Sequence, residues 1–154
     1  MKKFLAALVV LTTMSFSPGI AKTIPDPRDI KVSHIVQESL KKQFPDAENV
    51  QWQKIGDYYV ASFSHDMHKL SVYFDENGGV YSTTRFITTE ALPLNALKSV
   101  KERYDVTDND LSAMEVSKES RTYYLLSFIK NGKSFIISSD ASGSLQVVKK
   151  QKVG

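Results

Sequence analysis

Apolar and polar positions alternate with a period of two along residues 58–63 and 70–74. This alternation predicts two antiparallel β-strands, joined near Asp66 and Met67. The same reasoning places further strands at residues 50–53, 80–87, 111–118, 122–130, 133–139 and 145–153. Tight turns that need glycine separate several of them, at Asn77-Gly78-Gly79, Asn131-Gly132 and Ser142-Gly143.

Two other stretches follow the period of an α-helix. Residues 32–44 carry an apolar stripe that ends at Pro45, and residues 94–104 carry a second stripe just after Pro93. A proline near the first helical turn is harmless, because the backbone N–H that it lacks would have no partner there. The stripes consist of Val32, Ile35, Val36, Leu40 and Phe44, and of Leu94, Leu97, Val100 and Tyr104.

The chain also repeats one of its segments. A shift of 65 positions carries residues 57–81 onto residues 122–146 without a gap, so that Tyr58 falls on Tyr123 and Phe63 on Phe128. We interpret this as a duplication, in which each copy is a helix followed by four strands. The expected fold class is therefore α+β, with two tandem repeats of one helix and a four-stranded antiparallel sheet in two layers. Phe63 and Phe128 should occupy equivalent core positions.

The first residues predict export. Lys2 and Lys3 precede a short apolar run, and Gly19 and Ala21 are the small residues that a signal peptidase requires. An uncleaved membrane anchor is the alternative, but the run is shorter than the ~20 apolar residues that span a bilayer. We expect a signal peptide at 1–21, a proline-containing linker at 22–31, and two units at 32–87 and 88–154. The mature protein should be periplasmic, or secreted, without membrane insertion.

Composition narrows the classes of function. Without Lys2 and Lys3, 18 basic residues face 17 acidic ones, and the formal charge falls from +3 to +1. The isoelectric point near 9.0 is therefore no argument for a nucleic-acid partner. The chain contains no cysteine, which excludes a disulfide, a metal-thiolate site and a cysteine nucleophile.

Several short motifs in this order resemble one protein family. The matching residues are Phe44-Pro45-Asp46-Ala47, Val50, Trp52, Phe74-Asp75-Glu76-Asn77-Gly78 and Leu92-Pro93. They resemble the PepSY-like proteins, also called β-lactamase-inhibitor-like, which are small exported proteins of Gram-negative bacteria with tandem α-β4 units. The likeness runs from about residue 32 to 153. It implies non-catalytic binding to a protein, and it supplies no inhibitory residue. The second unit departs from the family pattern at Tyr104-Asp105 and Ser139-Asp140.

Candidate catalytic and metal-binding residues are few. His65 and His68 have the spacing of some zinc ligand pairs, but the duplication places Lys130 and Lys133 at the same positions, which is typical of solvated side chains. Asp75 begins a segment similar to a calcium loop without its closing glutamate, so a β-turn is the favoured interpretation. The chain has no G-x-S-x-G or H-E-x-x-H motif. We therefore expect no enzyme, no metal site and no cofactor.

The tyrosine-rich strands carry the best functional hypothesis. If Tyr59 and Tyr124 face the helices, then Tyr58, Val60, Tyr123 and Leu125 lie on the opposite face of the sheet. Either the two units cover this apolar face or it binds a partner. We expect an exported non-catalytic binding module for a periplasmic or envelope protein. The alternative is binding of a peptide or small ligand in a cleft between the units.

Export should remove residues 1–21 in a single cleavage, because the small residues Gly19 and Ala21 stand at positions −3 and −1 of the site. Intact-mass spectrometry of the exported protein should identify Lys22 as its first residue. Recovery of the uncleaved chain from the membrane fraction would contradict this prediction.

Overall fold

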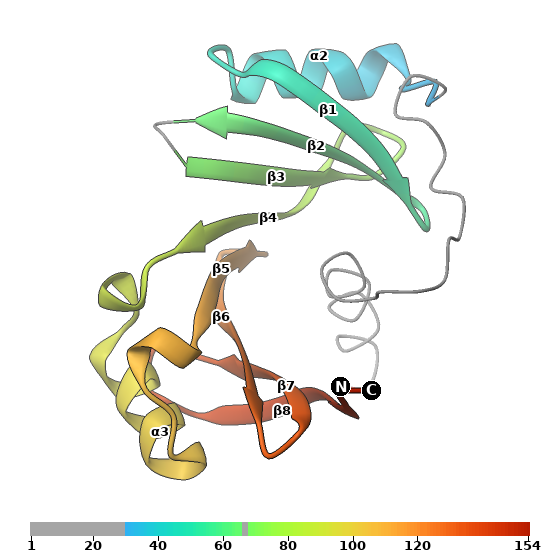
Figure 1. Cartoon of the computed structure of the whole chain (residues 1–154). Helices are drawn as coiled ribbons and strands as arrows, with labels where there is room; N and C mark the ends of the chain where they lie inside the picture. Colours follow the sequence, from blue (N-terminus) through green and yellow to red (C-terminus); the bar gives the residue numbers. More distant parts are fainter. Residues whose placement is uncertain (1–29, 66–67) are drawn as a thin grey trace. The chain divides into compact units, whose positions relative to one another are not determined.

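A computed structural model describes residues 30–65 and 68–154 of the chain (Figure 1). The expected signal peptide, all of the expected linker before residue 30 and the hairpin tip at residues 66–67 lie outside the described residues. The elements in chain order are α2 (His34–Gln43), β1 (Glu48–Ile55), β2 (Tyr58–His65), β3 (His68–Phe74), β4 (Val80–Ile87), a 3₁₀ turn (Thr89–Ala91), α3 (Leu94–Tyr104), a 3₁₀ turn (Asp108–Asp110), β5 (Ser112–Lys118), β6 (Arg121–Lys130), β7 (Lys133–Ser139) and β8 (Leu145–Lys152).

The expected fold class, two α+β repeats that each have a four-stranded sheet, is wrong. The strands form one eight-stranded sheet in the order β1 to β8, and with only two α-helices among the described residues the fold is mostly β. Local periodicity predicts which side each residue of a strand faces, but it carries no information on where a sheet ends. A sheet that continues through eight strands has two edge strands instead of four, and so leaves fewer backbone groups unpaired.

Residue contacts divide the chain into two compact units. Within the described residues, the N-terminal unit runs to Arg85 and also includes Ser117–Glu119, while the C-terminal unit consists of Phe86–Val116 and Ser120–Gly154. Each unit has its own helix and its own apolar cluster.

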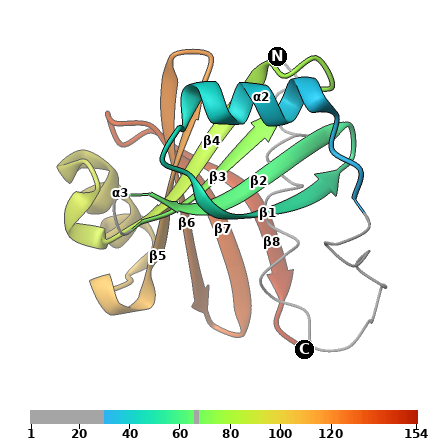
Figure 2. The same ribbon diagram turned by 90° about the horizontal axis from the view of Figure 1, so that it is seen from above.

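In the N-terminal unit, α2 lies across the strands β1 to β4 (Figure 1, Figure 2). Ser33 caps its first turn, where the side-chain oxygen accepts a hydrogen bond from the backbone N–H of Val36 at 3.4 Å. Val36 and Leu40 are buried against the sheet, and the ring of Phe44 packs edge-on against that of Phe63 with 5.4 Å between centroids. The buried core of this unit consists of Val36, Leu40, Ala61, Phe63, Val72 and Phe74.

In the C-terminal unit, α3 lies beside β8 and buries Ala96 and Val100 (Figure 1). Asp105 ends this helix in the left-handed conformation, with φ of 50°, and Lys130 bonds both its backbone oxygen and its carboxylate. The rings of Phe128 and Phe135 stack with 5.1 Å between centroids. Phe63 and Phe128 are 5% and 4% exposed, so the expectation that both belong to a core is confirmed.

A turn glycine touches the helix in each unit. The Ser39 hydroxyl donates to the backbone oxygen of Gly78 at 2.7 Å, and a Cβ atom on Gly143 would lie 2.6 Å from both the Asn95 carbonyl oxygen and the Ser99 hydroxyl oxygen. Both glycines have a positive φ, of 80° at Gly78 and 88° at Gly143, and residues that carry a side chain rarely adopt such a conformation. At Gly143, crowding and the positive φ both require glycine, whereas at Gly78 a Cβ atom would lie 3.1 Å from the backbone oxygen of Ile35 and the positive φ is the stronger reason.

The aspartates before these glycines shape the turns. The Asp75 carboxylate accepts from the backbone N–H groups of Asn77 and Gly79, at 2.9 and 2.8 Å, and Asp140 accepts from those of Ser142 and Ser144. The Ser142 hydroxyl also donates to the Asp140 carboxylate, at 2.6 Å, and this bond is the largest cause that holds the pKa of the Asp140 carboxyl below its ordinary value, followed by the bond from the backbone N–H of Ser144. The hydrogen bonds of Asp75 agree with the prediction from the sequence that its segment forms a β-turn.

Gly143→Ala should lower the free energy of unfolding by about 3 kcal/mol, because the new methyl group meets the helix backbone and the φ of 88° is strained. Gly132→Ala is the matched control. Gly132 also has a positive φ, of 65°, but a Cβ atom there would have no neighbour within 4 Å, so the expected loss is about 1 kcal/mol. Equal losses in urea unfolding curves would show that the contact with α3 does not matter.

Candidate functional site

Tyr58 lies on the sheet face that points away from α2. The neighbouring Tyr59 packs against the core beneath the helix, while the ring of Tyr58 stacks on that of Tyr81 with 4.4 Å between centroids and 29° between planes. This confirms the expected alternation of the two tyrosines. Tyr58 and Tyr81 are both half-buried, so part of the stack is accessible to solvent.

Lys118 completes this arrangement. Its Nζ atom lies over the Tyr81 ring, 3.9 Å from the centroid, and donates a hydrogen bond to the Tyr81 hydroxyl. We call Tyr58, Tyr81 and Lys118 the tyrosine–lysine stack. All three belong to the N-terminal unit, since Ser117–Glu119 is part of it. Each side chain limits the rotation of the next, so the exposed part of Tyr58 is presented in one orientation.

The stack also changes the acidity of Tyr58. Burial raises the pKa of its phenol above 10.0, and the hydrogen bond to Tyr81 and the charges of Tyr81, Asp57 and Asp75 raise it further. The hydroxyl is therefore neutral in ordinary solution. A neutral phenol can both donate and accept a hydrogen bond.

The residues next to Tyr58 on the same face of the sheet are buried. Val60 is 2% exposed and stands opposite Tyr73, which in turn stands opposite Ser82. Burial raises the pKa of Tyr73 to about 12, so this phenol is also neutral. Val60 thus supports the position of Tyr58 on β2 and offers almost no surface of its own.

The corresponding strand of the C-terminal unit repeats this pattern in part. Tyr124 packs with the core, while Tyr123 is half-buried and Leu125 is only 5% exposed. Tyr81 and Lys118 could not be recognised as neighbours of Tyr58 from the sequence. Of the three residues in the tyrosine–lysine stack, the alternation of apolar and polar positions in the sequence identifies only Tyr58.

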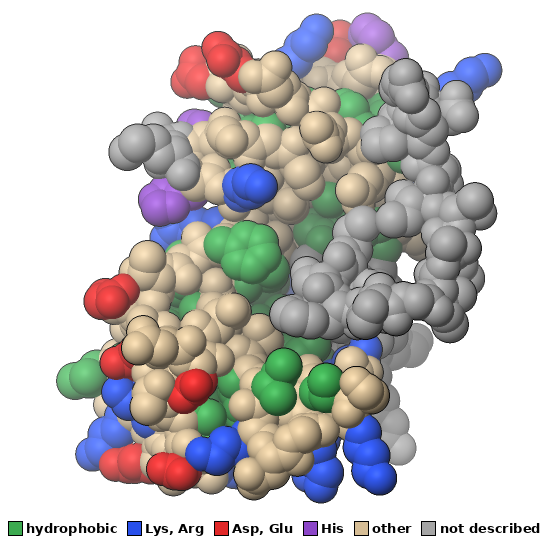
Figure 3. All heavy atoms as spheres, in the orientation of Figure 1, with side chains coloured by type: hydrophobic (Ala, Val, Ile, Leu, Met, Phe, Trp, Pro, Cys, Tyr) green, Lys and Arg blue, Asp and Glu red, His purple; other side chains and the backbone are tan. Residues whose placement is uncertain are grey.

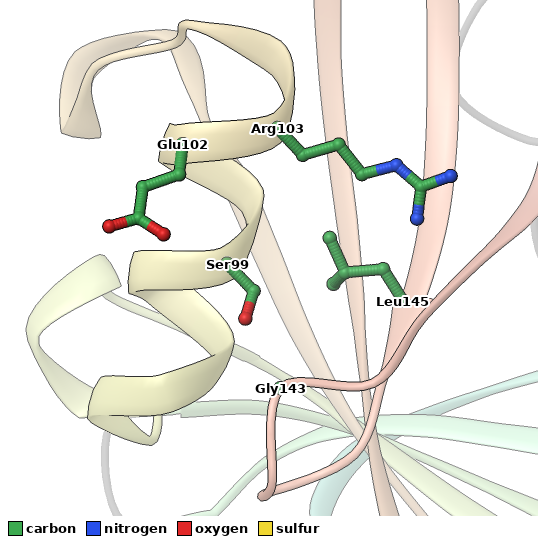
Figure 4. Close-up of a pocket in the computed structure, with 5 residues that line it drawn as sticks. All are labelled: Ser99, Glu102, Arg103, Gly143 and Leu145. Carbon is green, nitrogen blue, oxygen red and sulfur yellow. The ribbon is translucent and has the colours of Figure 1, made fainter.

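Among the described residues, two of the hollows are lined partly by helix residues. One, of about 380 Å³, lies between α3 and the turn before β8 and is lined by Ser99, Glu102, Arg103, Gly143 and Leu145 (Figure 4). Glu102 and Arg103 point to different sides there, so their charges do not converge on one ligand (Figure 4). The other, of about 160 Å³, is lined by Gln37, Leu40, Lys41, Phe44, Pro45, Ala47, Val50 and Trp52. Neither lining contains a histidine or cysteine beside a possible nucleophile.

The remaining surface offers scattered apolar side chains. Ile35, Phe86, Leu94 and Ile129 are each more than half exposed. On the face drawn in Figure 3, the hydrophobic side chains of the described residues form small separate groups among polar ones. Single exposed apolar residues of this kind are common on soluble domains.

No protein-family model matches the chain, and no curated protein matches it. Several solved structures do. A candidate periplasmic protein from Bacteroides eggerthii has 19% identity and a TM-score of 0.70, and the match covers 80% of this chain and 90% of that one. A DUF2874 family protein from Bacteroides uniformis has 18% identity and a TM-score of 0.70, covering 80% and 91%. A BLIP-like protein from Bacteroides fragilis has 24% identity and a TM-score of 0.64, covering 80% and 88%.

These likenesses concern the fold. Within the described residues, no helix is long and apolar enough to cross a membrane. The chain shares its fold with these Bacteroides proteins, and a BLIP-like fold, the structural part of the resemblance seen in the sequence, is supported.

Proposed function

We propose that this chain is a non-catalytic, exported binding module that recognises a periplasmic or envelope protein through its partly exposed tyrosines. The observation that carries the proposal is the tyrosine–lysine stack, in which the ring of Tyr58 stacks on that of Tyr81 while remaining partly accessible. Tyr123, at the matching position of the C-terminal unit, is the second anchor in this proposal.

The physical chemistry of a stacked tyrosine suits recognition of a protein. Tyrosine has a large apolar ring with a polar tip, and its neutral hydroxyl can bond with a polar group of the partner. Because Tyr81 and Lys118 already restrain the ring, binding orders little that was previously mobile. Val60 and Leu125, which are buried, would hold the tyrosines in place and would not touch the partner.

The neighbouring structures support this proposal at a coarse level. One of them is described as BLIP-like and another as a candidate periplasmic protein. We extend both descriptions to this chain as a proposal: it acts in the periplasm, after removal of residues 1–21, by binding and without chemistry. The finer relationship to the PepSY-like family belongs to the same proposal and depends on the short motifs of the sequence.

The variant Tyr58→Ala with Tyr123→Ala should stay folded and bind the partner more weakly, by about 2 kcal/mol for each tyrosine. The partner is first captured from a periplasmic extract with wild-type protein, identified by mass spectrometry, and then titrated against each variant. Phe86→Ala, which removes another exposed aromatic ring, is the control and should leave the affinity unchanged.

Unchanged affinity in the folded double variant would refute the proposed binding face. If the double variant unfolds, the tyrosines serve packing, and the face again loses its support. If a small molecule or peptide is captured in place of a protein, ligand binding becomes the better explanation.

A further inference from the structure

Two histidines stand side by side where β2 meets β3. His65 is the last residue of β2 and His68 the first of β3, and the two are direct partners in the register of the antiparallel pair. Directly opposed residues project to the same face of a sheet, with Cβ atoms roughly 4.5–5.5 Å apart. From the sequence we expected no metal site at these two residues, because their spacing alone does not give the register that places them side by side.

The two rings differ in their surroundings. His65 is half-buried, and its ring lies edge-on to Phe44, with 6.3 Å between centroids and 84° between planes. Phe44 is itself held against Phe63 in the core. His68 is exposed. One imidazole is therefore anchored to the folded unit, while the other can turn toward it from the solvent side.

We propose that His65 and His68 chelate a single divalent transition-metal ion, such as Cu²⁺, Ni²⁺ or Zn²⁺. Imidazole nitrogen suits these ions, at distances of about 2.0–2.1 Å for zinc, and two opposed imidazoles can reach one ion together. No group of three or more histidine, cysteine or acidic residues among the described residues could hold a metal. The ion therefore keeps water on its other positions and exchanges readily, unlike a structural zinc.

The C-terminal unit has the same geometry without the ligands. Lys130 and Lys133 are direct partners in the register of β6 and β7, and a lysine ammonium group cannot bind a metal. Lys130 instead bonds Asp105 at the end of α3. Both hairpins thus contact the end of the preceding helix, but only the N-terminal one presents two imidazoles.

The test is a calorimetric titration of untagged mature protein with NiCl₂. Wild type should bind one equivalent, and His68→Ala should lower the affinity about a hundredfold, as expected when one of two linked ligands is lost. The control is His34→Ala. His34 is the only histidine in α2, its side chain is 81% exposed, and its Nδ1 atom lies 3.6 Å from a carboxylate oxygen of Glu38. In NMR spectra, the imidazole signals of His65 and His68 should shift together.

Wild-type affinity in His68→Ala, or an equal loss in His34→Ala, would overturn the proposal. A second variant tests the geometry by gain of binding, which a loss of stability cannot mimic. Lys130→His with Lys133→His places two imidazoles in the same register of the C-terminal unit and should raise the stoichiometry from one ion to two. A stoichiometry that stays at one would overturn the argument from register.

Discussion

The close approach of a β-turn to the helix is the constraint on which each unit depends. Gly78 accepts a hydrogen bond from Ser39 at 2.7 Å, and the space beside Gly143 is already occupied by the backbone of Asn95. A side chain at Gly143 would have to push the helix away from the sheet, and one at Gly78 would lie 3.1 Å from the helix backbone at Ile35. Because the apolar clusters lie between helix and sheet, the packing of Val36 or Val100 depends on a contact at the rim of the core.

The same constraint decides which residues are left for function. Once a helix covers one face of the strands, alternation sends Tyr58 to the other face, where Tyr81 and Lys118 hold it. The proposed binding element is therefore a restrained surface residue and not a cavity. The hollow beside α3 has charged side chains that point apart, so their charges do not converge on one small ligand (Figure 4).

The two units carry side chains of different chemistry at matching positions. At the end of the hairpin, His65 and His68 in one unit correspond to Lys130 and Lys133 in the other, each pair in direct register. The lysine at position 130 bonds the end of α3, whereas the histidine at position 65 packs against an aromatic ring. The same backbone geometry thus carries two imidazoles in one unit and two lysine ammonium groups in the other, and only the imidazoles can bind a transition metal.

The local features of this protein could be predicted from its amino-acid sequence. Period two separated Tyr58 from Tyr59 and assigned Phe63 and Phe128 to the core, and glycine chemistry placed the turns at Gly78 and Gly143. Two features became known only from the three-dimensional structure: the eight strands form one sheet, and Lys118 contacts Tyr81, which lies 37 residues earlier in the chain. Alternation follows from the geometry of a single strand, so it predicts the direction of a side chain. What covers that side chain, and where the sheet ends, depends on contacts between distant segments, which no local pattern encodes.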